Sequence, residues 1–243
     1  MILNYSHSNI NFKKNTVIIA GAGPGSKKLV TLKLNFILKL ADVIIYDALV
    51  NKLILKDCKE KVMLIYAGKT KKNSCTQSEI NHLMVKHAKL GKRVLRLKGG
   101  DVSFFSRASQ EVQFLKKNKI KFKVFTAITS SQASASETNQ LFFNKKRNCN
   151  FFTGHKKINS TSKEVDYSNI SKNKGKIFIY MGISQIEEIS RNLQKNHISP
   201  DEKVSIVKNA SLKNQKIYTT NLKDCTSFIK KNKITSPAIL IIR

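Results

Sequence analysis

Two acidic side chains follow short apolar segments, at positions where a sheet commonly binds small molecules. Asp101 comes directly after Gly99-Gly100, which ends the β-forming run 93–98, and Asp47 ends another apolar run. A carboxylate at a strand end can accept a proton, and adjacent glycines let the backbone approach a ligand closely. Gly-Gly-Asp alone is equally compatible with an ordinary turn after a strand. Asp101 thus lies where an α/β sheet normally binds small molecules, just outside the end of a strand.

A glycine-rich loop earlier in the chain admits a second interpretation. The apolar segment 16–20 runs into Gly21-Ala-Gly-Pro-Gly25, and a helical pattern and then Asp47 follow, which is the order of a βαβ unit. The same order suits a dinucleotide-binding loop, in which the acid holds a ribose. However, Ser26 stands where that fingerprint requires its third glycine, and Pro24 removes a backbone donor from the loop. We therefore do not expect a nicotinamide cofactor.

The cysteines and histidines indicate neither a metal site nor a disulfide framework. The four cysteines are widely scattered, and no two of them form a CxxC pair. His82 and His87 lie five positions apart on a predicted helix, which turns their side chains onto different faces. We expect reduced, structural thiols and no bound metal.

Length and composition indicate a globular protein of one large or two small domains. The chain has 243 residues, of which 41% are hydrophobic, with few prolines and glycines. No apolar run approaches the roughly 20 residues that a membrane-spanning helix needs. A polar segment at 4–11 argues against a signal peptide. We therefore expect a cytoplasmic protein that does not associate with a membrane.

The formal charge of +30 at pH 7 concentrates anions around the protein. Nucleic acid and a small polyanionic substrate are both candidate ligands for such a field. The lysines are spread along the whole chain, which favours compositional bias over a dedicated nucleic-acid face. No nucleic-acid partner is expected on this pattern.

Hydrophobic periodicity predicts two α/β halves. Strands are expected at 16–20, 43–46, 62–66, 93–98, 123–125, 177–180, 203–207, 216–220 and 238–242. A capping box of Thr76 and Glu79 opens a helix that ends at Gly91, and Ser184 with Glu187 predicts another capping box. The alternation of strands and helices is typical of α/β proteins.

The boundary between the halves is expected at about residues 130 to 150. We predict a frayed amino terminus over 1–15, an N-terminal α/β domain over 16–130, a linker over 131–149 and a C-terminal α/β domain over 150–243. A polar insert at 156–174 reads as a surface loop. Two such lobes would leave a cleft between them, which is the usual place for a small-molecule site.

Seven motifs occur in the order seen in the tetrapyrrole methyltransferase family. They are Gly21-Ala-Gly-Pro-Gly25, Tyr46-Asp47 with Leu49-Val50, Gly68-Lys69, Leu97-Lys-Gly-Gly-Asp101, Ile128-Thr-Ser130, Thr153-Gly154-His155 and Tyr180-Met-Gly182. The resemblance extends from Thr16 to the end of the chain. Within the family, the Tyr-Asp-x-Leu-Val and Gly-Lys elements are most similar to members that act on uroporphyrinogen III. The resemblance implies a two-lobed fold with the active site in the cleft between two α/β domains.

The implied reaction transfers two methyl groups from S-adenosyl-L-methionine to ring carbons of uroporphyrinogen III. The tetrapyrrole product is precorrin-2, reached through precorrin-1, and S-adenosyl-L-homocysteine is released. Precorrin-2 feeds the routes to cobalamin or sirohaem, and the family implies a homodimer. A positively charged protein suits this substrate, because uroporphyrinogen is a polycarboxylate.

The resemblance also assigns roles to individual residues. Asp47 would accept a proton and Lys69 would donate one, although the residues alone would suggest a turn cap and a solvated loop lysine. The positions implied to hold S-adenosyl-L-methionine are Pro24, Gly99, Gly100, Asp101, Phe104, Thr129, Ser130, Met181 and Ala210. Arg107 and Glu111 match the segment that meets the tetrapyrrole, and their alternative is a surface ion pair.

The chain departs from the family pattern in the segment after Asp101. Val102-Ser103 stands where relatives have Pro-Phe, and Gln110 replaces an acid. Two rival functions stand beside the implied one. One is a methylase of a later corrin intermediate, and the other is an RNA-binding derivative that has kept the fold but lost the chemistry.

Overall fold

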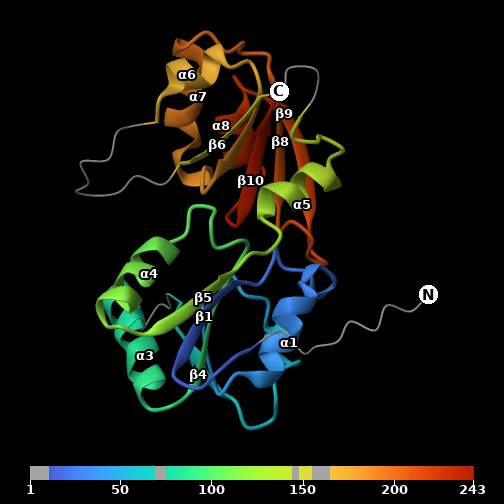
Figure 1. Ribbon diagram of the computed structural model, residues 1–243. Coiled ribbons are helices and arrows are strands. Elements are labelled where there is room, and N and C mark those ends of the chain that lie inside the picture. The colour runs from blue at the N-terminus through green and yellow to red at the C-terminus, as the bar shows by residue number, and fades with distance from the viewer. Residues whose placement is uncertain (1–10, 69–74, 144–147, 155–164) are drawn as a thin grey trace. The chain divides into compact units, whose positions relative to one another are not determined.

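Two five-stranded sheets organise the protein in the computed structural model, which describes residues 11–68, 75–143, 148–154 and 165–243. The chain divides into two compact units, an N-terminal unit up to Thr129 and a C-terminal unit from Ser130. Each unit combines one sheet with several helices (Figure 1). The α/β class expected from the alternating pattern is confirmed.

The apolar runs of the N-terminal unit form a parallel sheet with the order β3-β2-β4-β1-β5. Its strands are β1 (Thr16–Gly21), β2 (Val43–Tyr46), β3 (Met63–Tyr66), β4 (Arg93–Lys98) and β5 (Lys121–Phe125). β1 and β4 are central strands covered on both faces, which explains why apolar residues occupy successive positions in them. β3 and β5 are the edges of the sheet.

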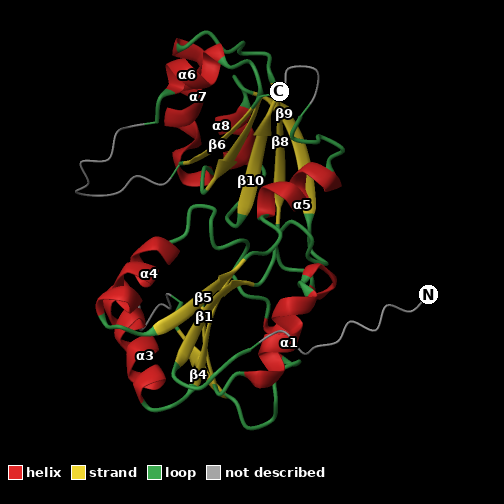
Figure 2. Cartoon of the chain, in the orientation of Figure 1, coloured by secondary structure: helices red, strands yellow, loops and turns green. Residues whose placement is uncertain are grey.

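Helices cover both faces of this sheet (Figure 2). One face packs against α1 (Leu32–Leu40), with the 3-10 turn η2 (Lys27–Leu29) and the short helix α2 (Lys52–Leu55) nearby. The other face packs against α3 (Gln77–Lys89) and α4 (Ala108–Lys117). Alternate residues of each strand face the two helical layers, so one sheet builds two apolar cores.

The start and the end of α3 agree with the sequence prediction. Thr76 and Glu79 form the reciprocal capping box, which satisfies two backbone amides that the first helical turn leaves without partners. Gly91 ends the segment with a φ of +78°, a conformation that costs glycine little because it has no Cβ atom.

The sheet of the C-terminal unit is mixed and has the order β6-β7-β10-β8-β9. Its strands are β6 (Cys149–Thr153), β7 (Lys176–Tyr180), β8 (Lys203–Lys208), β9 (Lys216–Asn221) and β10 (Ala238–Ile242). β6 and β7 pair in parallel, whereas β10 and β9 run antiparallel to their neighbours. β6, β7 and β8 therefore share one direction, and their carboxyl ends lie at the same edge of the sheet.

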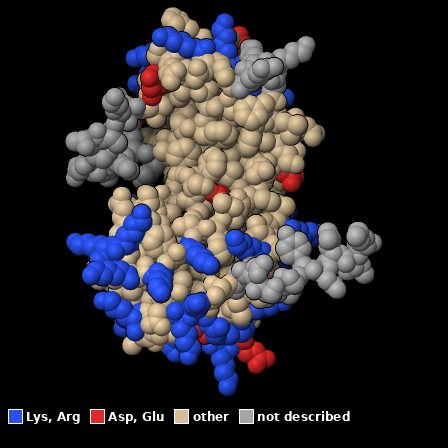
Figure 3. Space-filling model, in the orientation of Figure 1, with Lys and Arg blue, Asp and Glu red and all other residues tan. Residues whose placement is uncertain are grey.

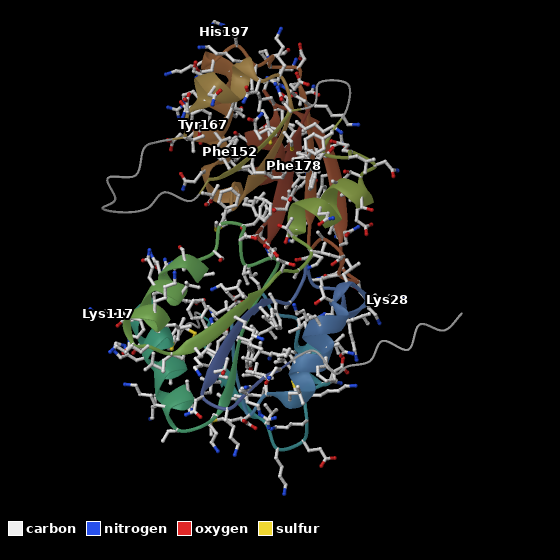
Figure 4. The ribbon with its side chains drawn as sticks, viewed as in Figure 1. Lys28, Lys117, Phe152, Tyr167, Phe178 and His197 are labelled. Atoms are coloured by element: carbon white, nitrogen blue, oxygen red, sulfur yellow. The ribbon has the colours of Figure 1, made fainter. Side chains whose placement is uncertain are left out.

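Both faces of this second sheet are also packed. The helices α6 (Tyr167–Lys172), α7 (Ile186–Lys195) and α8 (Cys225–Lys231), with the 3-10 turn η3 (Ile183–Gln185), contribute to one core. On that side, the rings of Phe152 and Tyr167 meet edge to face with centroids 5.9 Å apart (Figure 4). On the other side, α5 (Ser130–Glu137) packs against β10, and Phe178 stacks on Phe151.

Four details differ from the sequence predictions. Ser184 forms no capping box, because it lies within η3, and α7 begins after Gln185 without a side-chain cap. The predicted linker begins with α5, whose serines and alanines give no apolar stripe for a periodicity argument to detect. Phe12 is buried at 6% exposure in a segment predicted to be frayed, whose residues 1–10 are outside the description. The insert predicted at 156–174 is described only from residue 165, where α6 follows.

Among the described helices, none is both long enough and apolar enough to cross a bilayer.

Candidate functional site

Loops at the carboxyl edge of the N-terminal sheet are joined by reciprocal backbone hydrogen bonds. Because β1, β2 and β4 run parallel, the glycine loop, Asp47 and the Gly-Gly-Asp segment meet there. The amide of Gly23 donates to the carbonyl of Gly100 at 3.2 Å, and the amide of Gly100 donates back at 2.8 Å. Two loops far apart in sequence are therefore joined by a short antiparallel bridge between Gly23 and Gly100.

This bridge between the two loops requires glycine at particular positions. Gly23 and Gly100 have φ values of +77° and +69°, which side chains with a Cβ atom rarely adopt. A Cβ atom on Gly21 would lie 2.4 Å from the carbonyl oxygen of Gly100. A Cβ atom on Gly99 would lie 2.5 Å from the Cβ atom of Leu49. The glycines thus serve close backbone packing as well as any approach to a ligand.

The carboxylate of Asp101 holds this edge together. One oxygen accepts a hydrogen bond from the amide of Ala127 at 2.6 Å, and the other accepts from the amide of Ser103 at 2.8 Å and from the Ser103 hydroxyl. The residue is only 5% exposed. Asp101 therefore ties the loop after β4 to the chain that leaves β5.

Asp47 follows β2, the neighbour of β4 in the sheet, and keeps part of its surface open. Its Oδ1 accepts hydrogen bonds from the amides of Leu49 at 3.1 Å and Gly99 at 3.3 Å. Its Oδ2 lies 3.9 Å from a terminal nitrogen of Arg96, and the side chain is 25% exposed. These contacts fix the orientation of the carboxylate, and its open surface lets a ligand reach it, so Asp47 can act as a base.

A cluster of buried charged residues contacts Asp47 through Arg96. Arg96 and Lys98 of β4 both donate to the same oxygen, Oε1, of Glu111 on α4, at 3.1 Å and 3.0 Å. Gln77 donates to this oxygen as well, at 3.3 Å. The residues Arg96, Lys98 and Glu111 are 3%, 6% and 0% exposed. We call these three residues the buried triad.

Burial shapes the chemistry of the buried triad. Desolvation, followed by the nearby positive charge of Arg96, lowers the pKa of Lys98 below its usual value. The second oxygen of Glu111 has no hydrogen-bond donor among the residues that the structure describes. The signal for this cluster was present in the sequence, since two cations at alternate positions of a central strand share one face and require a buried anion.

In the C-terminal unit, predicted donor-binding residues lie at strand ends. Met181 follows β7 with a φ of +51° and is 44% exposed, and Ala210 follows β8 and is buried. Tyr180 donates from its hydroxyl to the hydroxyl oxygen of Ser131 at 2.6 Å, next to Ser130 at the first position of α5. This bond holds the start of α5 close to the end of β7, and sequence patterns gave no sign of it.

The remaining predicted residues fall into three groups. Pro24 and Phe104 are half-buried in the loops that follow β1 and β4, and Thr129 is buried just before α5. Arg107 is exposed at the N-cap of α4, four residues before the buried Glu111. Lys69 and His155 lie outside the described residues. The prediction of a tetrapyrrole contact for Glu111 differs from its observed position, because no part of this residue reaches the surface.

Two of the four thiols are unsuited to nucleophilic chemistry. Burial raises the pKa of Cys58 and of Cys149 to about 11, so both are protonated at neutral pH. Within the described segments, no three His, Cys, Asp or Glu residues group in a way that could hold a metal ion.

Comparison with known proteins yields one family. The family model for tetrapyrrole (corrin/porphyrin) methylases matches residues 16–226. The uroporphyrinogen-III C-methyltransferase of Methanocaldococcus jannaschii is 37% identical over 230 residues, which cover 93% of this chain and 94% of that protein. The sirohaem synthase of Ruthia magnifica is 34% identical over 229 residues. That match covers 93% of this chain but only 48% of the synthase, so the chain spans about half the length of such relatives.

Solved structures agree with this family. A cobalt precorrin-4 methyltransferase superposes with a TM-score of 0.82 over 94% of each chain, and its 21% sequence identity supports the fold alone. The uroporphyrin-III C-methyltransferase of Thermus thermophilus, solved with S-adenosyl homocysteine, superposes with a TM-score of 0.77 at 26% identity. That match covers 93% of this chain and 91% of the other.

The contacts of Asp101 predict a specific loss of stability. We expect Asp101→Asn to lower the free energy of unfolding by about 1–3 kcal/mol, because an amide nitrogen would then face a buried backbone donor. Urea denaturation followed by circular dichroism measures the effect. Asp57→Asn is the matched control, since it removes a more exposed ion pair with Lys27 and should cost no more than about 0.5 kcal/mol. Equal losses of unfolding free energy in the two variants would contradict the role of Asp101 in joining the loop after β4 to the segment after β5.

Proposed function

Because this chain belongs to the tetrapyrrole (corrin/porphyrin) methylase family, we propose that it methylates uroporphyrinogen III twice and yields precorrin-2. S-adenosyl-L-methionine is the methyl donor, and S-adenosyl-L-homocysteine is its product. The observation that carries this proposal is the 37% identity to a uroporphyrinogen-III C-methyltransferase across nearly the full length of both chains.

The residues at the strand ends have the chemistry that the donor requires. S-adenosyl-L-methionine supplies an activated methyl group, so the protein chiefly has to align the reactants and exclude water. The half-buried backbone at Gly99 and Gly100, with Phe104 close by in sequence, offers polar and apolar contacts together. The full set that we assign to donor binding is Pro24, Gly99, Gly100, Asp101, Phe104, Thr129, Ser130, Met181 and Ala210. Asp101 contributes by holding the loops, because its oxygens already accept backbone hydrogen bonds.

Asp47 is the proton acceptor in this proposal. A ring carbon of the tetrapyrrole forms a bond to the methyl carbon while the bond from that carbon to sulfur breaks, and the macrocycle must then lose a proton. Asp47 is suited to take it, since its carboxylate is held by two amides and by Arg96 and is partly exposed. Lys69 is the proposed proton donor.

The charge distribution of the protein suits a polycarboxylate substrate. Figure 3 shows Lys and Arg side chains gathered over the N-terminal unit, with few acidic groups among them. Such a field raises the local concentration of an anionic substrate and speeds its encounter. Arg107 is exposed at the start of α4 and is the described cation that we assign to a substrate carboxylate.

The protein is further proposed to form a homodimer. Exposed apolar side chains gather on the edge strand β3 and on the segments that follow its neighbour β2: Leu49, Leu53, Met63, Leu64 and Tyr66. The opposite edge strand, β5, instead carries Lys121 and Lys123, which discourage pairing with another chain. Uncharged edge residues suit contact with a second copy. We further place the protein in the cytoplasm and its product on the routes to cobalamin or sirohaem.

Methyl transfer can be tested directly. The purified protein, incubated without oxygen with uroporphyrinogen III and methyl-labelled S-adenosyl-L-methionine, should yield a tetrapyrrole that has gained two methyl groups. Mass spectrometry after oxidation of the product reads the gain. A protein that binds the donor but adds no methyl group to this acceptor would retain the family and refute the proposed substrate.

Asp47→Ala should separate chemistry from binding. We expect turnover to fall by about 10²- to 10⁴-fold, the usual contribution of a general base. The affinity for S-adenosyl-L-methionine, measured by calorimetry, should stay nearly unchanged. Asp57→Ala is the control, because Asp57 pairs with Lys27 in a partly exposed ion pair, and neither residue is assigned to donor binding or catalysis, so the variant should keep full activity. Loss of donor affinity with unchanged turnover per bound donor would remove the assigned role.

The assembly can be tested by sedimentation equilibrium. We expect a dimer for the unaltered protein and a shift toward monomer for Leu64→Lys, since a charge on the edge of β3 would have to be buried on assembly. Val124→Lys places the same charge on β5, where Val124 is 44% exposed, and should leave the dimer intact. The β3 surface is excluded as the interface if both variants behave alike.

A further inference from the structure

The buried triad lies next to Asp47, the carboxylate that we assign as the proton acceptor. Arg96 connects the two, because its Nε donates to Glu111 at 3.1 Å while a terminal nitrogen lies 3.9 Å from Asp47. Its other terminal nitrogen donates to the carbonyls of Ile45 and Leu97, both at 3.2 Å. Each arm of the guanidinium is therefore occupied, and Ile45 lies on β2, two residues before Asp47, which follows the strand.

Packing alone does not account for these charges. Removing a carboxylate and two cations from water is costly, and apolar residues of similar volume often stabilise a protein as well or better. The triad is also imperfectly satisfied, since three donors converge on Oε1 of Glu111 while Oε2 has none among the described residues. An arrangement of this kind indicates that the position and the charge of its members matter for the adjacent carboxylate.

We infer that Glu111 and Lys98 are positioning residues for Asp47, which they control through Arg96. Glu111 holds the guanidinium in place by its contact with Nε, and the guanidinium in turn orients the Asp47 carboxylate. Lys98 balances the charge of Glu111, to which it donates at 3.0 Å. This inference rests on the proposed role of Asp47 as proton acceptor.

Charge balance is the second part of the arrangement. Asp47 and Glu111 contribute two negative charges, and Arg96 and Lys98 contribute two positive charges, so the group as a whole is neutral. Neutralising Glu111 while Lys98 keeps its proton would leave one excess positive charge in a low-dielectric environment close to Asp47. That charge would stabilise the carboxylate and make it a weaker base. Neutralising Lys98 together with Glu111 would restore the balance.

The remaining groups near Asp47 do not replace the triad. Tyr46 precedes it on β2, and the ring of Tyr66 on β3 meets that of Tyr46 edge to face with centroids 5.5 Å apart. Leu49 and Gly99 contribute only backbone amides. Among the described residues, the charged group in contact with Asp47 is therefore Arg96 of β4, which Glu111 of α4 holds in place.

Glu111→Gln tests the inference in the full-length protein. We expect turnover with uroporphyrinogen III to fall by about 3- to 10-fold, and the acid limb of the rate profile to move about one pH unit lower, because of the excess positive charge. The KM for S-adenosyl-L-methionine should not change. Glu187→Gln is the matched control, since Glu187 lies on α7, pairs with Lys230 at the surface and is 67% exposed. It should keep both the rate and the profile.

Two further variants keep the test decisive if Glu111→Gln folds poorly. The double variant Glu111→Gln with Lys98→Gln has balanced charge, and its acid limb should return to the position of the unaltered protein. Arg96→Lys keeps the charge but loses the planar contacts, so its rate should fall while its acid limb stays in place. A purely structural role would reduce the amount of folded protein and leave the profile of the folded fraction unmoved in every variant.

The outcomes distinguish this inference from the proposed function. Absence of methyl transfer by the unaltered protein would overturn both. Methyl transfer that loses its rate in Asp47→Ala but keeps rate and acid limb in Glu111→Gln would retain the proposed function and overturn the positioning role. Lower turnover with a shifted acid limb, recovered in the double variant, would establish it.

Discussion

The cost of burying charge in the central strand of the first sheet constrains the N-terminal unit. Arg96 and Lys98 point from β4 into the layer formed by α3 and α4, so α4 must present a carboxylate at the matching height. Glu111 meets that requirement from the first turn of α4. The ion pairs of Glu111, and not apolar packing alone, therefore fix the position of α4 along the sheet. Arg96 also lies 3.9 Å from Asp47 at the sheet edge.

The edge itself is organised by backbone as much as by side chains. Reciprocal hydrogen bonds between Gly23 and Gly100 join the loops after β1 and β4, and Asp101 joins the latter to the end of β5. A parallel sheet brings such loops together because all its strands end on one side. The glycines at 21 and 99 then allow the close packing that side chains would block.

Sequence patterns predicted the strands well but not the partners of the polar residues. Apolar runs indicate buried strands, and the Thr76 capping box depends only on local chemistry, so both were predictable. The backbone partner of Asp101 depends on how β5 pairs, and the burial of Glu111 depends on which side of α4 meets the sheet. Neither is local. Family motifs indicated which residues matter, but Glu111 shows that a motif position does not reveal whether its side chain meets a ligand or another side chain.

The shared oxygen of Glu111 has a consequence for how this sequence can change. Lysine is abundant on the surface, where one substitution alters little and each position can drift alone. Arg96 and Lys98 both donate to one oxygen of Glu111. A substitution at any of these three positions therefore changes which residues are tolerated at the other two. We therefore expect exchanges at these three positions to be tolerated chiefly as coordinated changes that keep the charges balanced.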